Sequence, residues 1–168
     1  SQEQIIKRHL VSYSFFEVIN NPFIADKKEN SIKIDNPLDS RKRFLRTTLK
    51  ESLIKNLLYN ERRQKDSIKL FEVSDIYFNS NGLDQKRVLG VICTGRIGRN
   101  YNDFSKYIDK KYLEKIFSEL DTGHNIEISE IDRKELDTKI KSRIYYIEIE
   151  LNNLNLKSKT PSLSNVYN

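Results

Sequence analysis

The stretch NPLDSRKRFLRTTLKESLIKNLLYN, residues Asn36–Asn60, decides the fold together with ERRQKDSIKLFEVSDIYF, residues Glu61–Phe78. Asn36-Pro37 predicts a turn, because the residue before a proline is pushed away from helical geometry. Thr48-x-x-Glu51 has the pattern of a capping box, which marks the start of a helix. Apolar residues then recur at helical spacing and predict an amphipathic helix packed on a core: Leu49, Leu53, Ile54, Leu57 and Leu58.

Strand patterns lie on both sides of that helix. Aromatic and β-branched residues predict strands over Ser12–Asn20 and Ser31–Asp35. Ser67–Val73 and Asp75–Asn79 form two strand segments or one bent strand. The turn sequence Asn79-Ser80-Asn81-Gly82 then predicts a tight hairpin. The other expected elements are a helix ending near Leu10, an apolar strand over Val88–Thr94, a helix capped at Asp103 or Ser105, and strands over Asn125–Ile131 and Arg143–Leu151.

These elements predict an α+β fold with a mostly antiparallel sheet flanked by helices, because consecutive strands are joined by short turns. The 168 residues are 37% apolar and 32% charged, which fits one globular domain. We expect the folded domain to span residues 1–154, and the polar residues 155–168 to form a linker or tail toward a further module.

The chain has no signal peptide and no apolar run of about 18 residues, so we expect a cytoplasmic protein that does not enter a membrane. Cys93 is the single cysteine and lies in an apolar run. We expect it to be a buried structural thiol, since no second cysteine can pair with it.

Positive charge is concentrated in one segment. Between Arg41 and Lys65 the chain has nine basic and two acidic residues, a local charge of +7 in a chain of net charge +6. Such a block fits contact with a polyanion or with an acidic protein surface, or is simply a solvated helix face. The candidate phosphate contacts are Arg41, Arg43, Arg46, Arg62 and Arg63.

Catalytic and metal-binding patterns are sparse. His9 and His124 are the only histidines, and we interpret both as exposed polar residues. Glu148 and Glu150 alternate along one strand face and are expected to face solvent. Gly95-Arg96-Ile97-Gly98-Arg99 lacks the spacing of a phosphate-binding loop and is interpreted as a turn with two surface arginines. We therefore predict no catalytic residue, no cofactor-binding residue and no metal ligand.

Five short motifs occur in a family order: Phe15-Phe16-Glu17-Val18-Ile19, Asn36-Pro37-Leu38-Asp39, Leu45-Arg46-Thr47-Thr48-Leu49, Asn60-Glu61-Arg62-Arg63 and Leu70-Phe71-Glu72-Val73-Ser74-Asp75-Ile76-Tyr77. In this order they resemble the β subunit of bacterial phenylalanyl-tRNA synthetase, in the module that looks like a class II synthetase core. The match is closest over residues 12–95. Ser14 and Ser74 stand where the family favours glycine. We expect the chain to be an excised fragment of such a subunit.

The resemblance implies a class II aminoacyl-tRNA synthetase-like fold that does not activate the amino acid. In agreement, the chain lacks an F-R-x-E arginine and a G-x-G-x-x-R motif. ATP and Mg²⁺ would belong to the holoenzyme and not to this fragment. The implied partners are the catalytic α subunit, in an (αβ)2 assembly, and tRNA. The candidate subunit-interface residues are Ile5, Ile6, Leu10, Phe15 and Val18.

We therefore expect a structural and assembly domain of the phenylalanine–tRNA ligase β chain, inactive alone, that supports tRNA charging in translation. The alternative is a free-standing basic module that binds nucleic acid, such as tRNA, without catalysis. An enzyme of another type is the third hypothesis, and the shortage of histidines and phosphate motifs argues against it.

Overall fold

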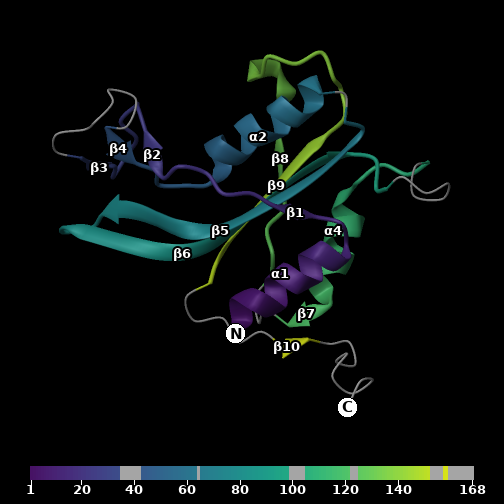
Figure 1. The fold of residues 1–168 in the computed structure, drawn as a ribbon, viewed down its shortest axis with the longest axis horizontal. Coiled ribbons are helices and arrows are strands. Elements are labelled where there is room, and N and C mark those ends of the chain that lie inside the picture. The colour runs from purple at the N-terminus through teal and green to yellow at the C-terminus, as the bar shows by residue number, and fades with distance from the viewer. Residues whose placement is uncertain (35–42, 64, 99–104, 122–124, 152–156, 159–168) are drawn as a thin grey trace.

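The computed structural model describes residues 1–34, 43–63, 65–98, 105–121, 125–151 and 157–158 (Figure 1). Its elements in chain order are α1 (Gln2–Ser12), β1 (Phe16–Glu17), β2 (Phe23–Ile24), β3 (Ile32–Lys33), β4 (Phe44–Leu45), α2 (Lys50–Arg62), β5 (Ser67–Asn79), β6 (Leu83–Gly95), α4 (Lys110–Ser118), β7 (Leu120–Asp121), β8 (Ser129–Ile131), η1 (Arg133–Glu135), β9 (Ile144–Glu150) and β10 (Lys157–Ser158).

The main sheet has five strands in the order β1-β5-β6-β9-β8. β1 runs parallel to β5, and the other three neighbouring pairs are antiparallel. The predicted α+β fold with a mostly antiparallel sheet flanked by helices is thus confirmed. Within the described residues, no helix is both long and apolar enough to cross a membrane.

The β5–β6 hairpin forms the centre of the sheet. Its strands pair without interruption from Ser67 opposite Gly95 to Asn79 opposite Leu83, so the predicted strand segments are one continuous strand. The hairpin turn has positive φ at Asn81 and Gly82, 56° and 120°, as its Asn-Gly sequence predicts.

Helices cover both faces of this sheet (Figure 1). α1 and α4 pack on one face, where alternate β6 residues such as Leu89 and Val91 join their core. α2 packs on the other face, over Val88 and Ile92. Helix and sheet approach closely at Gly90, where an added Cβ would lie 2.8 Å from Leu53 Cδ1.

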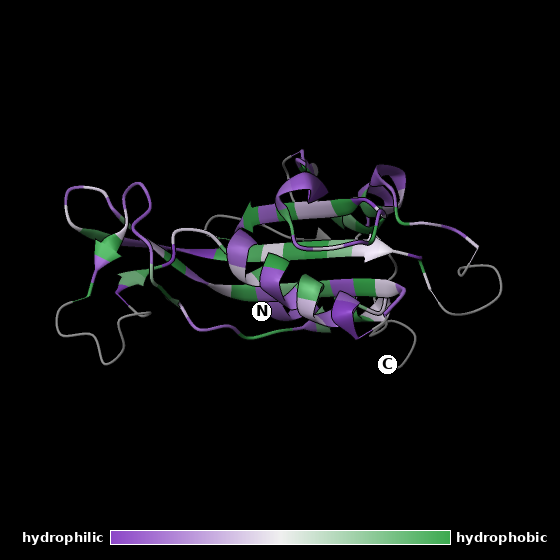
Figure 2. Ribbon diagram, turned by 90° about the horizontal axis from the view of Figure 1, so that it is seen from above, coloured by the Kyte–Doolittle hydropathy of each residue, from purple (hydrophilic) through white to green (hydrophobic). Residues whose placement is uncertain are grey.

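A second, three-stranded sheet, β2-β4-β3, lies over the turn end of the β5–β6 hairpin, at one end of the molecule (Figure 1 and Figure 2). The backbone N–H of Asn79 donates to the carbonyl of Asn30 (2.8 Å), which ties this sheet to the turn. Of its strands only β3 lies in a segment that the sequence predicted, because two-residue strands show no periodicity.

Several predicted element starts are wrong. The expected strand Ser12–Asn20 shortens to Phe16–Glu17, because α1 continues to Ser12 and Ser14 turns the chain with φ of 66°. The expected capping box at Thr48 does not form. α2 begins at Lys50 after Leu49, whose side chain makes no cap hydrogen bond.

The helix α4 is capped by Asp109, whose carboxylate accepts the N–H of Tyr112 (2.8 Å), and not by Ser105. Asp103, the other expected cap, lies outside the described residues. Strand β9 is also buried on both faces at its start: Tyr145 and Ile147 join one core, whereas Ile144 and Tyr146 join the other.

Candidate subunit-contact and phosphate-contact sites

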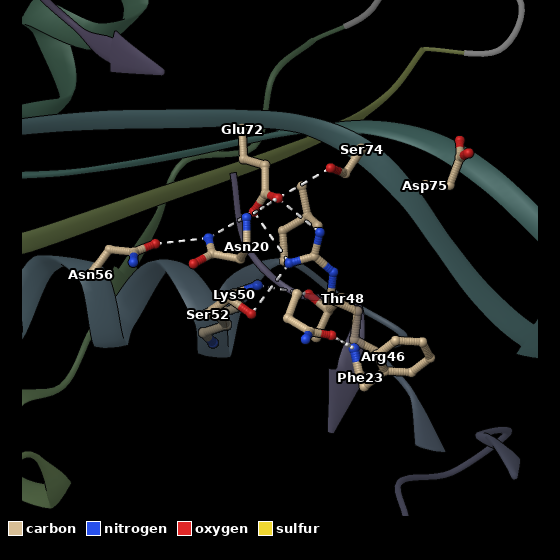
Figure 3. Close-up of polar contacts among 12 residues, drawn as sticks. Asn20, Phe23, Arg46, Thr48, Lys50, Ser52, Asn56, Glu72, Ser74 and Asp75 are labelled. Atoms are coloured by element: carbon tan, nitrogen blue, oxygen red, sulfur yellow. Dashed lines mark hydrogen bonds and ion pairs between the residues drawn. The ribbon is translucent and has the colours of Figure 1, made fainter. Parts of the chain in front are cut away.

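A buried ion pair lies between α2 and the sheet (Figure 3). Arg46 follows strand β4, and Glu72 lies in β5 beneath α2. The guanidinium donates to both carboxylate oxygens, Nη1 to Oε1 (3.2 Å) and Nη2 to Oε2 (2.8 Å). The two side chains are 3% and 1% exposed. This is the planar, two-bond geometry that arginine forms with carboxylates.

Neighbouring polar groups complete the cluster. Asn20 donates its backbone N–H and its side-chain amide to Glu72 (3.0 and 2.9 Å), and the Ser74 hydroxyl donates to the same carboxylate (3.1 Å). The Asn20 amide also donates to Asn56 Oδ1 on α2 (2.8 Å). Burial alone would raise the pKa of Glu72, but the hydrogen bonds from Arg46 and Asn20 outweigh burial and hold it below its ordinary value.

The cluster corrects one predicted phosphate contact. Arg46 is 2% exposed and both of its terminal nitrogens bond Glu72, so it is a structural residue and not a surface cation. Arg43 and Arg46 cannot be told apart from the sequence, because both lie in the same basic segment. What separates them is the buried carboxylate of Glu72, which the fold brings from another strand.

The remaining predicted cations do not gather at one place. Arg43 is exposed beside β4, whereas Arg62 and Arg63 are exposed at the opposite end of α2. A helix of 13 residues spans roughly 20 Å at 1.5 Å per residue, so these groups lie apart. The Arg63 guanidinium stacks on the Tyr59 ring, 4.4 Å from its centroid. Arg41 lies outside the described residues.

The predicted interface residues are mostly core. Ile6, Leu10 and Phe15 are 2%, 0% and 2% exposed, so none of them is available to a partner. They fill the space between α1, the sheet and α4, which is the ordinary fate of the apolar stripe of a surface helix. Ile5 and Val18 are half-buried against the two cores.

The apolar residues that do face outward are their neighbours. Phe16 and Ile19 are 70% and 89% exposed, and Val11 at the end of α1 is 57% exposed. Sequence reasoning missed them, although one signal was present. In the pair Phe15-Phe16, side chains of an extended segment point to opposite sides, so the two rings cannot both join the core beneath α1.

Two residues that were predicted to be polar and exposed, His9 and Glu148, make structural contacts. His9 is not a free surface residue, since its Nε2 contacts the carbonyl of Ile116 (2.5 Å) and joins α1 to α4. Glu148 is exposed, as predicted, yet it accepts hydrogen bonds from the Thr48 hydroxyl (2.8 Å) and the Leu49 N–H (3.0 Å) at the start of α2. His124 lies outside the described residues.

Cys93 is buried, as predicted, and burial raises the pKa of its thiol to about 12. Among the described residues, no group of three or more His, Cys, Asp or Glu side chains is arranged to hold a metal ion.

Comparison with known proteins decides the family. The family model described as phenylalanyl tRNA synthetase beta chain CLM domain matches residues 1–151. The chain belongs to this family.

Relatives in sequence are bacterial proteins named phenylalanine–tRNA ligase beta subunit. The one from Mycoplasma capricolum is 33% identical over 125 residues, which cover 68% of this chain and 15% of the relative. The one from Dehalococcoides mccartyi is 27% identical over 132 residues, which cover 73% and 16%. The chain therefore matches only about a sixth of the length of these synthetase subunits.

Solved structures agree on the fold. The crystal structure of pyrrolysyl-tRNA synthetase from Desulfitobacterium hafniense matches with a TM-score of 0.58 and 13% identity, over 88% of this chain and 64% of that one. The protein thus has the class II aminoacyl-tRNA synthetase-like fold that its sequence motifs predict.

Proposed function

We propose that this phenylalanyl-tRNA synthetase β domain is a non-catalytic core that packs on the catalytic α subunit and so supports the charging of tRNA. The observation that carries this proposal is the apolar edge of the main sheet at β1, where Phe16 and Ile19 are exposed. ATP and Mg²⁺ would then be bound by the α subunit of an (αβ)2 enzyme, and residues 1–154 would act as its scaffold.

The apolar edge has the properties of a protein interface. β1 is the terminal strand of the main sheet and lies between α1 and α2 (Figure 1). Phe16 and Ile19, 70% and 89% exposed, stand on or just after it. Large apolar side chains exposed at an open sheet edge favour a contact site, because soluble domains otherwise blunt such edges.

The ion pair beneath α2 supports a non-catalytic role. Glu72 of β5 is 1% exposed and forms an ion pair with Arg46. The pKa of Glu72 is lowered, so its carboxylate stays charged. Both terminal nitrogens of Arg46 are engaged by Glu72, so this arginine is not available to a phosphate. These features support a domain without adenylation chemistry.

The test is the affinity of the full β chain for its α subunit. Phe16→Ser and Ile19→Ser should each weaken the complex by about 5- to 30-fold, as truncation of a large apolar interface residue does. Leu83→Ser is the matched control, because Leu83 is also apolar and 67% exposed but lies at the far hairpin turn. The complex can be followed by light scattering or by calorimetry.

Unchanged affinity in the Phe16 and Ile19 variants, or equal loss in the Leu83 variant, would contradict the assignment of this edge. Phenylalanine-dependent ATP–pyrophosphate exchange by the isolated 168-residue chain would contradict the non-catalytic role. We expect exchange only from the complete enzyme.

A second candidate is a nucleic-acid-binding module that acts without the α subunit. The exposure of Arg43, Arg62 and Arg63 favours it. Binding of tRNA to the 168-residue chain should then weaken steeply with salt, and Arg62→Gln with Arg63→Gln should reduce that salt dependence.

A further inference from the structure

A hollow lies where the small sheet β2-β4-β3 meets the turn end of the β5–β6 hairpin (Figure 1). It is lined by residues of the segment before β3, of β3 and β4, and of the end of β5: Lys27, Ser31, Ile32, Lys33, Phe44 and Asn79. Its volume is about 480 Å³. This falls within the roughly 300–1,000 Å³ of pockets that hold one small molecule.

Backbone hydrogen bonds fix the segments that line the hollow. The Asn79 N–H donates to the Asn30 carbonyl (2.8 Å), which joins the hairpin to the segment before β3. In that segment the Ser31 N–H donates to the Lys28 carbonyl (3.1 Å), and Asn30 turns the chain with a left-handed φ of 61°. β3 and β4 are antiparallel neighbours. The hollow is therefore part of the fold and does not depend on the rotamer of one surface side chain.

The uncharged polar side chains of the hollow are left to donate. Ser31 Oγ already accepts the backbone N–H of Lys28 (2.8 Å). Asn79 Oδ1 already accepts the backbone N–H of Gly82 (3.1 Å). The Ser31 hydroxyl and the Asn79 amide N–H groups remain available to a ligand. Because none of the described residues that line the hollow is acidic, its complementary ligand is a hydrogen-bond acceptor.

Two lysines give the hollow its charge. Lys27 and Lys33 are exposed, and within the described part of the chain neither of them forms an ion pair. Lys28, in contrast, pairs with Glu51 on α2 (3.0 Å). Two ammonium groups beside one hollow create a positive potential that attracts an anion. The acceptor that fits the hollow is therefore an anionic one.

Ile32 and Phe44 add an apolar surface beside these donors. Both residues are half-buried, so part of each remains accessible to a ligand in the hollow. Removing this surface from water favours a ligand that carries a hydrocarbon part next to its charge. An inorganic anion would pair with the lysines but would leave Ile32 and Phe44 uncovered.

We propose that this hollow binds a small organic acid whose carboxylate pairs with Lys27 and Lys33 and whose hydrocarbon part covers Ile32 and Phe44. A free amino acid fits less well, because its ammonium group would lie beside two lysines. The C terminus of a peptide also fits less well, since its amide N–H adds a donor to a hollow of donors. The site lies apart from the apolar edge at β1 and does not depend on either function proposed above.

The test is a titration of the 168-residue chain with phenylpropionate at low salt, followed through the backbone amide signals by NMR. Saturable shifts should centre on Ser31–Lys33, Phe44 and Asn79. The Kd should be roughly 1–10 mM, as expected of a ligand with few atoms. Acetate, which lacks the hydrocarbon part, and phenylalanine, which adds the ammonium group, should each bind at least about 5-fold more weakly.

The variant Lys27→Gln with Lys33→Gln should weaken the binding of phenylpropionate about 3- to 20-fold, the effect of losing two exposed charge pairs. The matched control is Lys110→Gln with Lys111→Gln, which removes the same charge from exposed positions on α4. Equal weakening by the control would overturn the proposal, and so would shifts centred elsewhere on the chain.

The ligand series gives independent grounds for rejection. Acetate binding as tightly as phenylpropionate would show an adventitious anion only and would overturn the proposal. Phenylalanine binding as tightly would contradict the exclusion of an ammonium group. Tighter binding of N-acetylphenylalanine would assign the hollow to the C terminus of a peptide instead. No saturable shift at concentrations well above the expected Kd would overturn the proposal as well.

Discussion

Replacing Glu72 with glutamine should destabilise the domain by about 3–5 kcal/mol, the cost of leaving one member of a buried ion pair without its partner. The structure gives the reasons. The carboxylate and Arg46 are 1% and 3% exposed, so water cannot replace the missing charge. Asn20 and Ser74 also donate to this carboxylate, and an amide cannot accept all of these bonds. The loss is a large share of a typical domain stability of about 5–15 kcal/mol.

The measurement is urea unfolding of the 168-residue chain, followed by circular dichroism. Arg46→Met combined with Glu72→Leu should be more stable than either single change, because both charges then leave the core together. Lys86→Gln is the control, since Lys86 and Glu150 form an open pair, 44% and 45% exposed, worth at most about 1 kcal/mol. A Glu72→Gln loss as small as that of the control would refute the reasoning.

The same pair predicts a pH dependence. The pKa of Glu72 is lower in the folded chain than its ordinary value of 4.5, so the folded state binds fewer protons in acid than the unfolded state does. The stabilisation is therefore complete above about pH 4.5 and is lost as the pH falls through the folded pKa. Consequently, the stability difference between the parent chain and Glu72→Gln should shrink in urea titrations below pH 4.5.

Three other positions give measurable expectations. Gly90→Ala should cost about 1–3 kcal/mol in urea unfolding, because the new Cβ would meet Leu53 at 2.8 Å, whereas Gln85→Ala on the same strand should be neutral. Cys93 should resist a thiol reagent at pH 8 until urea unfolds the chain, since burial raises its pKa to about 12; rapid labelling of the native chain would disprove this. Glu148→Ala should cost about 1–2 kcal/mol, and no loss would mean that its bond to the Leu49 N–H does not stabilise α2.

The long elements were predictable because periodicity marks them. Asn81-Gly82 and two apolar runs indicate the β5–β6 hairpin, and the stripe of α2 faces the core as its spacing predicts. Helix starts were less predictable. Thr48 and Glu51 have the pattern of a capping box, but the fold brings Glu148 from 100 residues away to bond Thr48 instead.

Site residues were the least predictable, because exposure is decided by tertiary packing. Apolar character singled out Phe15, whereas Phe16 is the ring that faces outward. Positive charge singled out Arg46, whereas Glu72 beneath α2 neutralises it. The hollow at β3 joins Lys27 to Asn79, more than fifty positions later, so no local pattern could have revealed it.

The way α1 is attached has a consequence for how the chain acquires its structure. His9 contacts Ile116, 107 positions later, whereas the β5–β6 hairpin closes through a tight turn. Local contacts form fast and distant ones slowly, because a long loop must close first. On the ribosome, α1 emerges before β5 and β6, and its core is completed only when α4 and β9 follow. α1 thus comes before α4 and β9 in the chain but is secured only with them, and its apolar stripe is a surface that a nascent-chain chaperone would meet.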